Sequence, residues 1–479
     1  MGPVSTAEAG AEGPEGAESS EGRGGALARL AAIRHAGWGF VDQALSSLTN
    51  FGVGLAAART STAAEFGAFS VAFATYLIGV GVVRALISEV YSVRHASDVD
   101  PDAPLRERYP EVHGAWGAAL IVSVIGSLAC LVAALVASGD LRSCFLVLAV
   151  GLPFLVLQDV ARFIGITRRD AFGAMLYDAA WVVGFGGAMV VWSLVAGFPG
   201  AVVTFALWVF GAACGLVVAM WRMRAFPGLR SGLRFMKGVW RYSARYTGDW
   251  LALGATVQFG YYLLGATAGL AVVGQLRAGM LLIGPLNIVV AGAAIIAVPE
   301  MRRLSHGRDW GLKPAIVFSG ALVGMTLVWF ALIAIVPDSL LRKLLGDAAA
   351  DASDLLPFLL VYALANMAAQ GPMVALRATG NARRGTRASA PVAPLVLLGA
   401  AVGARITDDA TGALVAWTIS GLLIIVLGTW QLRQALREPT TGPGDTTDPL
   451  ADAERSVIVD SVLETDPSQL PGLGREPGG

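Results

Sequence analysis

Twelve apolar runs constrain the fold of this chain more than any other feature of its sequence. Each run holds roughly 20 residues, which is enough for a helix to cross a hydrocarbon core about 30 Å thick. Backbone groups in lipid must be paired within the chain, and runs of this length are too long for barrel strands. The sequence therefore predicts an all-α integral membrane protein with about twelve transmembrane helices. The runs cover residues 38–58, 66–90, 113–138, 143–166, 172–196, 200–221, 246–268, 271–299, 314–336, 354–376, 388–406 and 411–432.

The composition agrees with this class and excludes others. The chain is 55% hydrophobic and 15% charged, whereas charged residues make up about a quarter of ordinary soluble domains. Its formal net charge is zero, so nothing favours a nucleic-acid partner. The three cysteines lie in or beside apolar runs, without the spacing of a disulfide framework or a zinc site. We expect no metal, no cofactor and no catalytic residues.

The second half of the membrane region repeats features of the first half in the same order. The offsets between the copies lie between 207 and 215 residues. Because each copy holds an even number of spans, both have the same orientation, which predicts two parallel six-helix lobes around a central cavity. The repeated features are Arg162-x-x-Gly165-x-x-Arg168-Arg169 with Arg377-x-x-Gly380-x-x-Arg383-Arg384, Trp208 with Trp417, and Asp42 and Gly67 with Asp249 and Gly274.

These features divide the chain into five parts. We predict an N-terminal lobe over residues 35–224, a basic cytoplasmic linker over 225–245 and a C-terminal lobe over 246–436. Residues 1–34 and 437–479 are rich in Gly, Pro and acidic residues, a composition that cannot form a core. We expect both to be disordered cytoplasmic tails.

The basic residues predict the orientation. The loops assigned to the outside hold only Arg59, Arg142, Arg342, Lys343 and Arg405. Because Lys and Arg concentrate in cytoplasmic loops, this asymmetry places both termini inside the cell in a multi-pass protein of the plasma membrane.

Ionisable residues within the spans are costly and are candidates for function. Asp42, Asp249, Asp159, Arg162 and Asp178 all fall in the cytoplasmic third of their helices. We interpret them as an ionic network that acts as a gate or couples transport to an ion. Two structural alternatives stay open: Asp42 and Asp249 as caps of helix starts, and Asp159, Arg162 and Asp178 as a permanent staple between two helices.

Other polar residues predict a substrate cavity. The first and seventh spans are too polar to face lipid, and the eighth contains Gly284-Pro285, which predicts a kink. An arginine fork pairs bidentately with phosphate. Arg84 could instead extend to the interface, and the tyrosines could belong to the aromatic belt. The candidate substrate-binding residues are Arg84, Arg277, Asn50, Gln258, Tyr261 and Tyr262.

Four short motifs occur along the chain: Asp42-Gln43, Glu65-Phe66-Gly67, Gln158-Asp159-x-x-Arg162 with Asp178-x-x-Trp181, and Arg377-x-Thr-Gly-Asn-x-Arg-Arg. On these motifs the chain resembles the multidrug/oligosaccharidyl-lipid/polysaccharide (MOP) exporter superfamily, and within it the Wzx-like polysaccharide-biosynthesis members. The resemblance covers roughly residues 35–435.

The resemblance implies a MATE-like fold with two six-helix lobes in a V shape and a cavity lined by the first, second, seventh and eighth spans. It also implies a flippase that moves a polyprenyl-diphosphate-linked oligosaccharide to the outer leaflet by alternating access. Its partners would be the lipid-linked glycan, membrane lipids and glycan polymerase or glycosyltransferase machinery. The chain lacks the two extra C-terminal helices of the lipid II flippase.

Several alternatives stay open. A multidrug or cation antiporter of the same superfamily would use carboxylates in its cavity, and this chain offers both carboxylates and arginines. A membrane glycosyltransferase or polymerase would be an enzyme and would need a larger outer loop than residues 337–353. A major-facilitator transporter would carry Gly-x-x-x-Asp-Arg-x-Gly-Arg-Arg, which loop 91–112 lacks. A non-transporting scaffold would leave the symmetric polar helices unexplained.

Overall fold

The computed structural model describes residues 37–39, 41–95, 109, 111–304, 312–346 and 348–437, and these contain helices without any strand. The predicted tails over 1–34 and 437–479 lie outside this part, apart from Arg437 at the end of the last helix. The first half holds a helix over residues 41–59, α2 (Ala63–Val83), the π-helical turn η1 (Arg84–Ser88), α3 (Glu89–His95), α4 (Val112–Val136), α5 (Gly139–Thr167), α6 (Ala171–Ala196), α7 (Ala201–Met223) and α8 (Leu229–Asp249). The second half holds η2 (Trp250–Gly254), α9 (Thr256–Thr267), α10 (Leu270–Leu304), α11 (Lys313–Ile335), α12 (Asp338–Leu345), α13 (Ala348–Asp354), α14 (Leu356–Ala378), α15 (Ala382–Ser389), η3 (Leu395–Gly399), α16 (Ala400–Thr407) and α17 (Thr411–Arg437).

The all-α membrane fold is confirmed. Within the described part, nine helices are long and apolar enough to cross a membrane. The three other predicted spans correspond to the helix over 41–59, to α9 and to the shorter apolar helix Leu395–Thr407. α9 is shorter than the predicted span because the π-helical turn η2 and Ala255 precede it, and Leu395–Thr407, which begins with η3, is shorter because residues 390–392 form a turn. Such π-helical turns change the direction of a helix and often mark functional sites.

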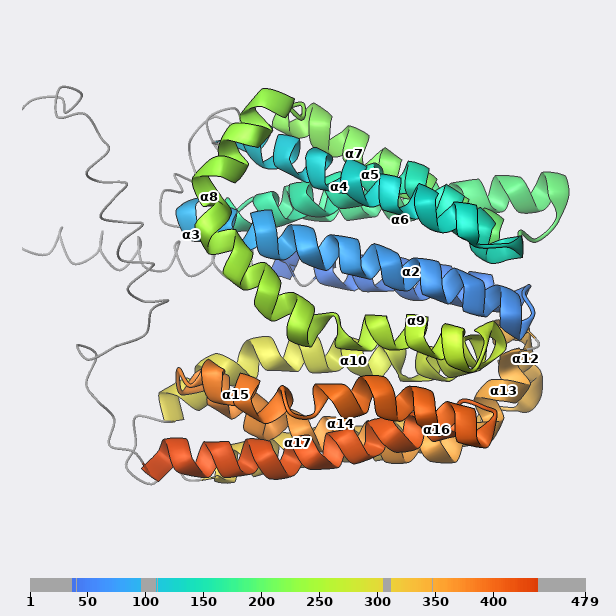
Figure 1. Ribbon diagram of the computed structural model, residues 1–479, viewed down its shortest axis with the longest axis vertical. Coiled ribbons are helices and arrows are strands. Elements are labelled where there is room, and N and C mark those ends of the chain that lie inside the picture. The colour runs from blue at the N-terminus through green and yellow to red at the C-terminus, as the bar shows by residue number, and fades with distance from the viewer. Residues whose placement is uncertain are drawn as a thin grey trace, which may run out of the picture.

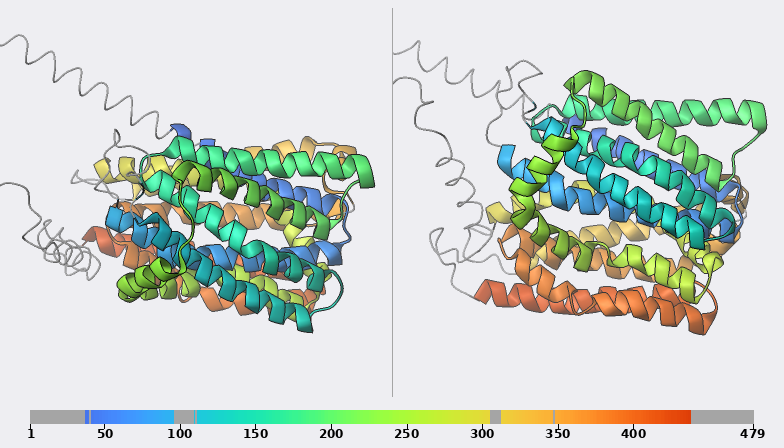
Figure 2. Two further views of the ribbon diagram at one scale, coloured as in Figure 1. Left: turned by 90° about the horizontal axis from the view of Figure 1, so that it is seen from above. Right: turned by 45° about the horizontal axis from the view of Figure 1, so that its top comes forward.

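The helices form two groups that lie lengthwise beside each other (Figures 1 and 2). In the first group α5 packs against α2, α4, α6 and α7, and in the second α14 packs against α10, α11 and α17. We call them the first and second lobes. The long helix α8 runs from the first lobe toward the second and joins them (Figure 1). We call the end of the bundle near α3, α8 and α15 the linker end, and the opposite end, near α12 and α13, the far end.

The two lobes touch at the far end through a glycine crossing. α2 begins there with a capping box, in which the Thr62 amide donates to the Glu65 carboxylate at 2.8 Å. One turn later a Cβ at Gly67 would lie 1.8 Å from the Leu270 carbonyl oxygen, and a Cβ at Gly274 would lie 1.9 Å from that of Ala63. Only glycine permits so close a backbone approach. The two glycines that the sequence repeat pairs therefore meet between α2 and α10.

The linker helix α8 is fixed to the first lobe by a second close approach. A Cβ at Gly117 of α4 would lie 2.0 Å from the Gly228 carbonyl oxygen, and one at Gly232 would lie 2.3 Å from the Gly117 carbonyl carbon. The buried side chains of Phe235 and Val239 extend this contact. The predicted basic linker is thus a helix that packs against the lobe.

Candidate functional site

A buried ionic cluster lies in the first lobe and joins three of its helices. The Arg162 side chain from α5 donates from Nε to Asp42 Oδ2 of the helix over 41–59 at 2.8 Å. Its Nη2 donates to Gln43 Oε1 at 2.9 Å. The same Nε lies 3.2 Å from Asp178 Oδ2 of α6, and Gln158 donates to the other oxygen of Asp178 at 2.7 Å. Asp42 and Asp178 are fully buried, so the arginine supplies the positive charge that they need in a low-dielectric interior.

A second ion pair lies beside this cluster. Arg84 donates from Nε to Asp159 Oδ2 at 2.8 Å, and its Nη2 donates to Asp159 Oδ1. The Asp159 side chain is 8% exposed, whereas that of Arg84 is 41% exposed. A guanidinium carries five N–H donors in a fixed fork. The two bonds to Asp159 use only two of these donors, so the others are left for a further partner.

The π-helical turn η1 connects this arginine to the linker helix. It begins at Arg84 and widens the helix of α2. The Ser243 hydroxyl of α8 donates to the Leu86 carbonyl oxygen within the turn at 2.6 Å. The ring of Trp250 lies against Gly81, where a Cβ would come within 1.9 Å of it. Ser243 of α8 and Trp250 of η2 thus make contacts on both sides of Arg84.

The predicted gate residues are only partly brought together. Asp42, Arg162 and Asp178 form one cluster, while Asp159 pairs with Arg84 in place of Arg162. The side chain of Asp249 lies outside the described residues. All the contacts that are described stay within the first lobe, an arrangement that resembles the structural staple. The role of these residues as a gate stays a prediction.

Three of the predicted substrate-binding residues carry buried polar atoms without a hydrogen-bond partner in the described part of the chain. These are Asn50 Oδ1, Gln258 Oε1 and Arg277 Nε. They come from the helix over 41–59, α9 and α10. The Arg277 guanidinium of the second lobe also stacks on the Phe73 ring of α2, 5.0 Å from its centroid. A buried polar atom without a partner calls for a water molecule or a ligand.

The two tyrosines of α9 have different surroundings. Tyr261 is buried and meets Trp417 edge-on, with ring centroids 6.4 Å apart, so it belongs to the core of the second lobe. Tyr262 bonds to the Thr75 hydroxyl of α2 across the lobes. Both Tyr262 and Thr75 line an apolar cavity of about 390 Å³ between α2, α4, α5 and α9. The substrate roles of both tyrosines stay predictions.

Two glutamines that were not predicted as site residues complete the ionic cluster. Gln43 and Gln158 belong to the short sequence motifs, and each bonds to a member of the cluster. Their positions next to Asp42 and Asp159 are the signal that could have identified them.

A separate polar contact holds the turn between α5 and α6. Asp170 caps α6, and its carboxylate accepts hydrogen bonds from Arg222 at 2.9 Å and from Tyr109. Burial alone would raise the pKa of Asp170, but the bonds from Arg222 and Tyr109 outweigh it and lower this pKa below its ordinary value. This contact could not be predicted from the sequence, because Tyr109, Asp170 and Arg222 lie far apart in the chain.

Comparisons with known proteins concern the fold. No protein-family model matches the chain, and neither does any curated protein. Among solved structures, an outward-facing multidrug resistance MATE family transporter of the MOP superfamily matches with a TM-score of 0.53 and 16% identity over 85% of this chain and 95% of that one. An inward-facing structure described in the same words gives a TM-score of 0.54 and 15% identity over 81% and 94%.

A MOP superfamily transporter from Pyrococcus furiosus, described as having a binding pocket of reverse polarity, matches with a TM-score of 0.50 and 17% identity. The match covers 85% of this chain and 96% of that one. At such identities the likeness concerns the fold alone. The chain therefore has the two-lobed fold of MATE-type transporters, as the sequence predicted.

Proposed function

We propose that the protein is a membrane transporter that works by alternating access and moves a polyprenyl-diphosphate-linked oligosaccharide to the outer leaflet of the plasma membrane. The fold supports the transport part, because similar structures exist in both outward-facing and inward-facing conformations. The two lobes meet through backbone at the Gly67–Gly274 crossing. Alternating access requires this far-end contact to separate and the linker end to close.

The observation that carries the proposal is the Arg84 guanidinium, which pairs with Asp159 on a side chain that is 41% exposed. Its pairing with Asp159 fixes the fork and leaves donors for a second anion. Each phosphate of a diphosphate offers pairs of oxygens that such a fork can bind bidentately. Because arginine keeps its charge at every physiological pH, it can hold phosphate throughout the transport cycle.

The carboxylates of the first lobe support a phosphate cargo over a cationic drug. Asp42 and Asp178 share Arg162, and Asp159 is bound by Arg84. A cation would have to displace an arginine from a buried carboxylate, which is costly in a low dielectric. A multidrug antiporter with the same fold remains the second candidate, because those three aspartates are the groups that it would use.

The apolar cavity beside Tyr262 supports the lipid part. It is lined by Val82 and Val83, which directly precede Arg84 on α2. A phosphate at Arg84 and a hydrocarbon chain in this cavity would fit one amphiphilic molecule. The unpaired amide oxygens of Asn50 and Gln258 would accept hydrogen bonds from sugar hydroxyls.

Transport in reconstituted vesicles tests the proposal. The assay follows the leaflet position of a polyprenyl-diphosphate oligosaccharide, with efflux of a cationic dye as the second measurement. We expect Arg84→Lys to slow flipping at least about tenfold, since Lys keeps the charge but loses the fork. Arg405→Ala, which removes an exposed pair with Asp408, is the matched control and should transport normally.

A folding defect must be separated from a transport defect. Arg84→Ala leaves Asp159 buried without a partner, so the double variant Arg84→Ala with Asp159→Asn is added to remove both charges. If both Arg84→Lys and this double variant are folded and flip at the normal rate, the phosphate contact is refuted. Dye efflux without glycan flipping would favour the multidrug alternative.

A further inference from the structure

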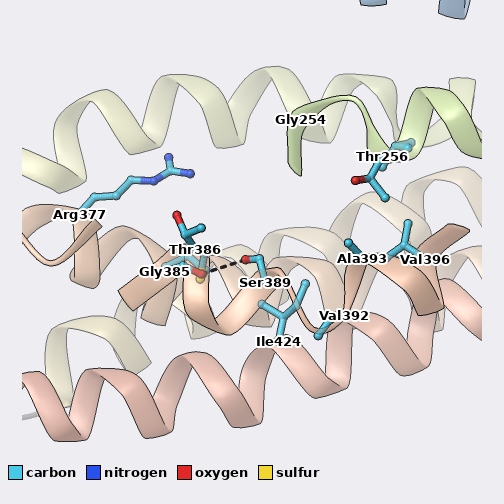
Figure 3. A pocket seen from close by; sticks show the side chains of 12 residues that line it. Gly254, Thr256, Arg377, Gly385, Thr386, Ser389, Val392, Ala393, Val396 and Ile424 are labelled. Atoms are coloured by element: carbon cyan, nitrogen blue, oxygen red, sulfur yellow. Dashed lines mark hydrogen bonds between the residues drawn. The ribbon is translucent and has the colours of Figure 1, made fainter. Parts of the chain in front are cut away.

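The second lobe has a cavity in the region that corresponds to the ionic cluster of the first lobe. Its volume is about 480 Å³, within the range of about 300–1,000 Å³ that is usual for small-molecule pockets. Residues of α14, α15, α17 and η3 line it together with residues of η2 and α9 (Figure 3).

The turns that follow α5 and α14 establish which residues correspond. In the first lobe the amides of Arg168 and Asp170 donate to the carbonyl oxygens of Ile164 and Gly165. In the second lobe the amides of Thr379 and Asn381 donate to those of Ala375 and Leu376 in the same pattern. In each turn the residue between the two amide donors has a positive φ, 56° at Arg169 and 74° at Gly380. The structural offset is therefore 211 residues.

This offset corrects the correspondence expected from the sequence. The arginine motif aligned Arg162 with Arg377, at an offset of 215. In the structure Met373 takes the position of Arg162, and Ser389 takes that of Asp178, and both line the cavity. Arg377 lies one helical turn closer to the end of α14. Where the first lobe has the buried ion pair of Arg162 and Asp178, the second lobe thus has a thioether and a hydroxyl.

The cavity combines an apolar wall with a basic end. Val392, Val396 and Ile424 continue the apolar surface of Met373. Figure 3 shows Arg377 reaching in at one end, beside the Thr386 hydroxyl. Both residues are exposed, and Arg377 has no ion pair or hydrogen bond with any residue that the structure describes. Ser389 instead donates to the Gly385 carbonyl oxygen at 3.1 Å.

We infer that this cavity binds the phosphate-bearing end of a membrane lipid, with the phosphate on Arg377 and Thr386 and the start of the hydrocarbon chain against Met373, Val392 and Ile424. An arginine fork and a hydroxyl are suited to phosphate oxygens. The apolar wall, without a buried charge, is suited to hydrocarbon. In the first lobe this chemistry is blocked, because Arg162 is neutralised by Asp42 and Asp178. The inference goes beyond the proposed function, since it holds for a lipid-linked cargo and for an ordinary phospholipid alike.

Lipid binding to the full-length protein in a neutral detergent tests the inference. The probes are undecaprenyl phosphate, phosphatidylglycerol and inorganic phosphate, measured by native mass spectrometry and by equilibrium binding. A charge-assisted pair contributes enough that Arg377→Gln should lower lipid affinity at least about tenfold. Arg387→Gln changes an exposed arginine of α15, next to Thr386 in sequence, that does not line the cavity; it is the matched control and should bind within about twofold of the unmodified protein.

Three further variants define the site. Val392→Phe fills the apolar part, so it should weaken lipid binding and leave inorganic phosphate binding unchanged. Thr386→Val removes the hydroxyl at nearly constant volume and replaces Arg377→Gln as the test if that variant does not fold. Asp249→Asn tests whether Asp249, which the repeat pairs with Asp42, neutralises Arg377 and so keeps it from binding phosphate. If only this variant binds lipid, Arg377 is neutralised within the chain and the inference is overturned.

The pattern of ligands separates the sources of the phosphate. Preference for undecaprenyl phosphate would assign the site to the cargo, and equal binding of phosphatidylglycerol would assign it to bulk lipid; both support a lipid phosphate site. Binding of inorganic phosphate without either lipid would refute it, as would equal affinities for Arg377→Gln and Arg387→Gln. A failure here leaves the Arg84 experiment unaffected.

Discussion

Replacing Arg162 by alanine should destabilise the first lobe strongly. The side chain is 8% exposed and contacts two carboxylates, Asp42 at 2.8 Å and Asp178 at 3.2 Å, whose side chains are 0% and 1% exposed. Without the guanidinium, two buried carboxylates would face each other with no countercharge. Breaking a buried ion pair by removal of one partner costs about 3–5 kcal/mol. This corresponds to at least about a hundredfold change in the ratio of folded to unfolded protein.

The assay is thermal unfolding of purified protein in detergent, together with the yield of monodisperse protein. The matched control is Arg405→Ala, because Arg405 and Asp408 form an ion pair whose side chains are 68% and 81% exposed. Exposed pairs contribute about 1 kcal/mol or less. Arg162→Ala should therefore unfold at a clearly lower temperature than the control.

A double variant identifies the cause. Asp178→Asn removes one of the two buried charges, so combining it with Arg162→Ala should recover part of the lost stability. If Arg162→Ala is as stable as Arg405→Ala, the cluster is hydrated and the reasoning from burial is refuted. An additive effect of the two substitutions would show that the arginine acts through packing instead of charge.

The remaining predictions concern the lobe contact, the topology and the turn between α5 and α6. Gly274→Ala should lower the free energy of unfolding by about 1–3 kcal/mol through overpacking, because its Cβ would lie 1.9 Å from the Ala63 carbonyl oxygen. The control Gly320→Ala places its Cβ in open space and should leave stability unchanged. Thermal unfolding measures both variants, and equal effects would contradict the glycine crossing. Reporter fusions after Thr440 and within 222–245 should report the cytoplasm and one within 338–352 the outside; a cytoplasmic signal from 338–352 would break the parallel repeat. The lowered pKa of Asp170 means that its contribution to stability is present above the unfolded carboxyl pKa of about 3.9 and is lost as the pH falls through the folded value. Asp170→Asn should therefore unfold more easily at pH 7, and its difference from the unmodified protein should shrink on acidification below about pH 4; a constant difference would rule out the charge.

The apolar runs determined the fold class because their lengths match a bilayer and lipid leaves helices as their only option. The repeat determined the two-lobed arrangement, because two copies that each hold an even number of spans have the same orientation. It also placed Gly67 and Gly274 at related positions, which the structure brings into contact. These properties depend on local composition and on chain order. Both can be read directly along a sequence.

The partners of the charged residues were decided by the tertiary structure. Asp159 and Arg162 are one helical turn apart, yet each pairs with a different helix, because the side chains of α5 diverge around its axis toward α2 in one case and toward α6 and residues 41–59 in the other. The true offset between the lobes at Arg377 also depends on hydrogen bonds in two turns, and a repeated arginine motif could not reveal it. Sequence spacing fixes which helix face a residue occupies, but the rotation and contact of helices decide what that face meets.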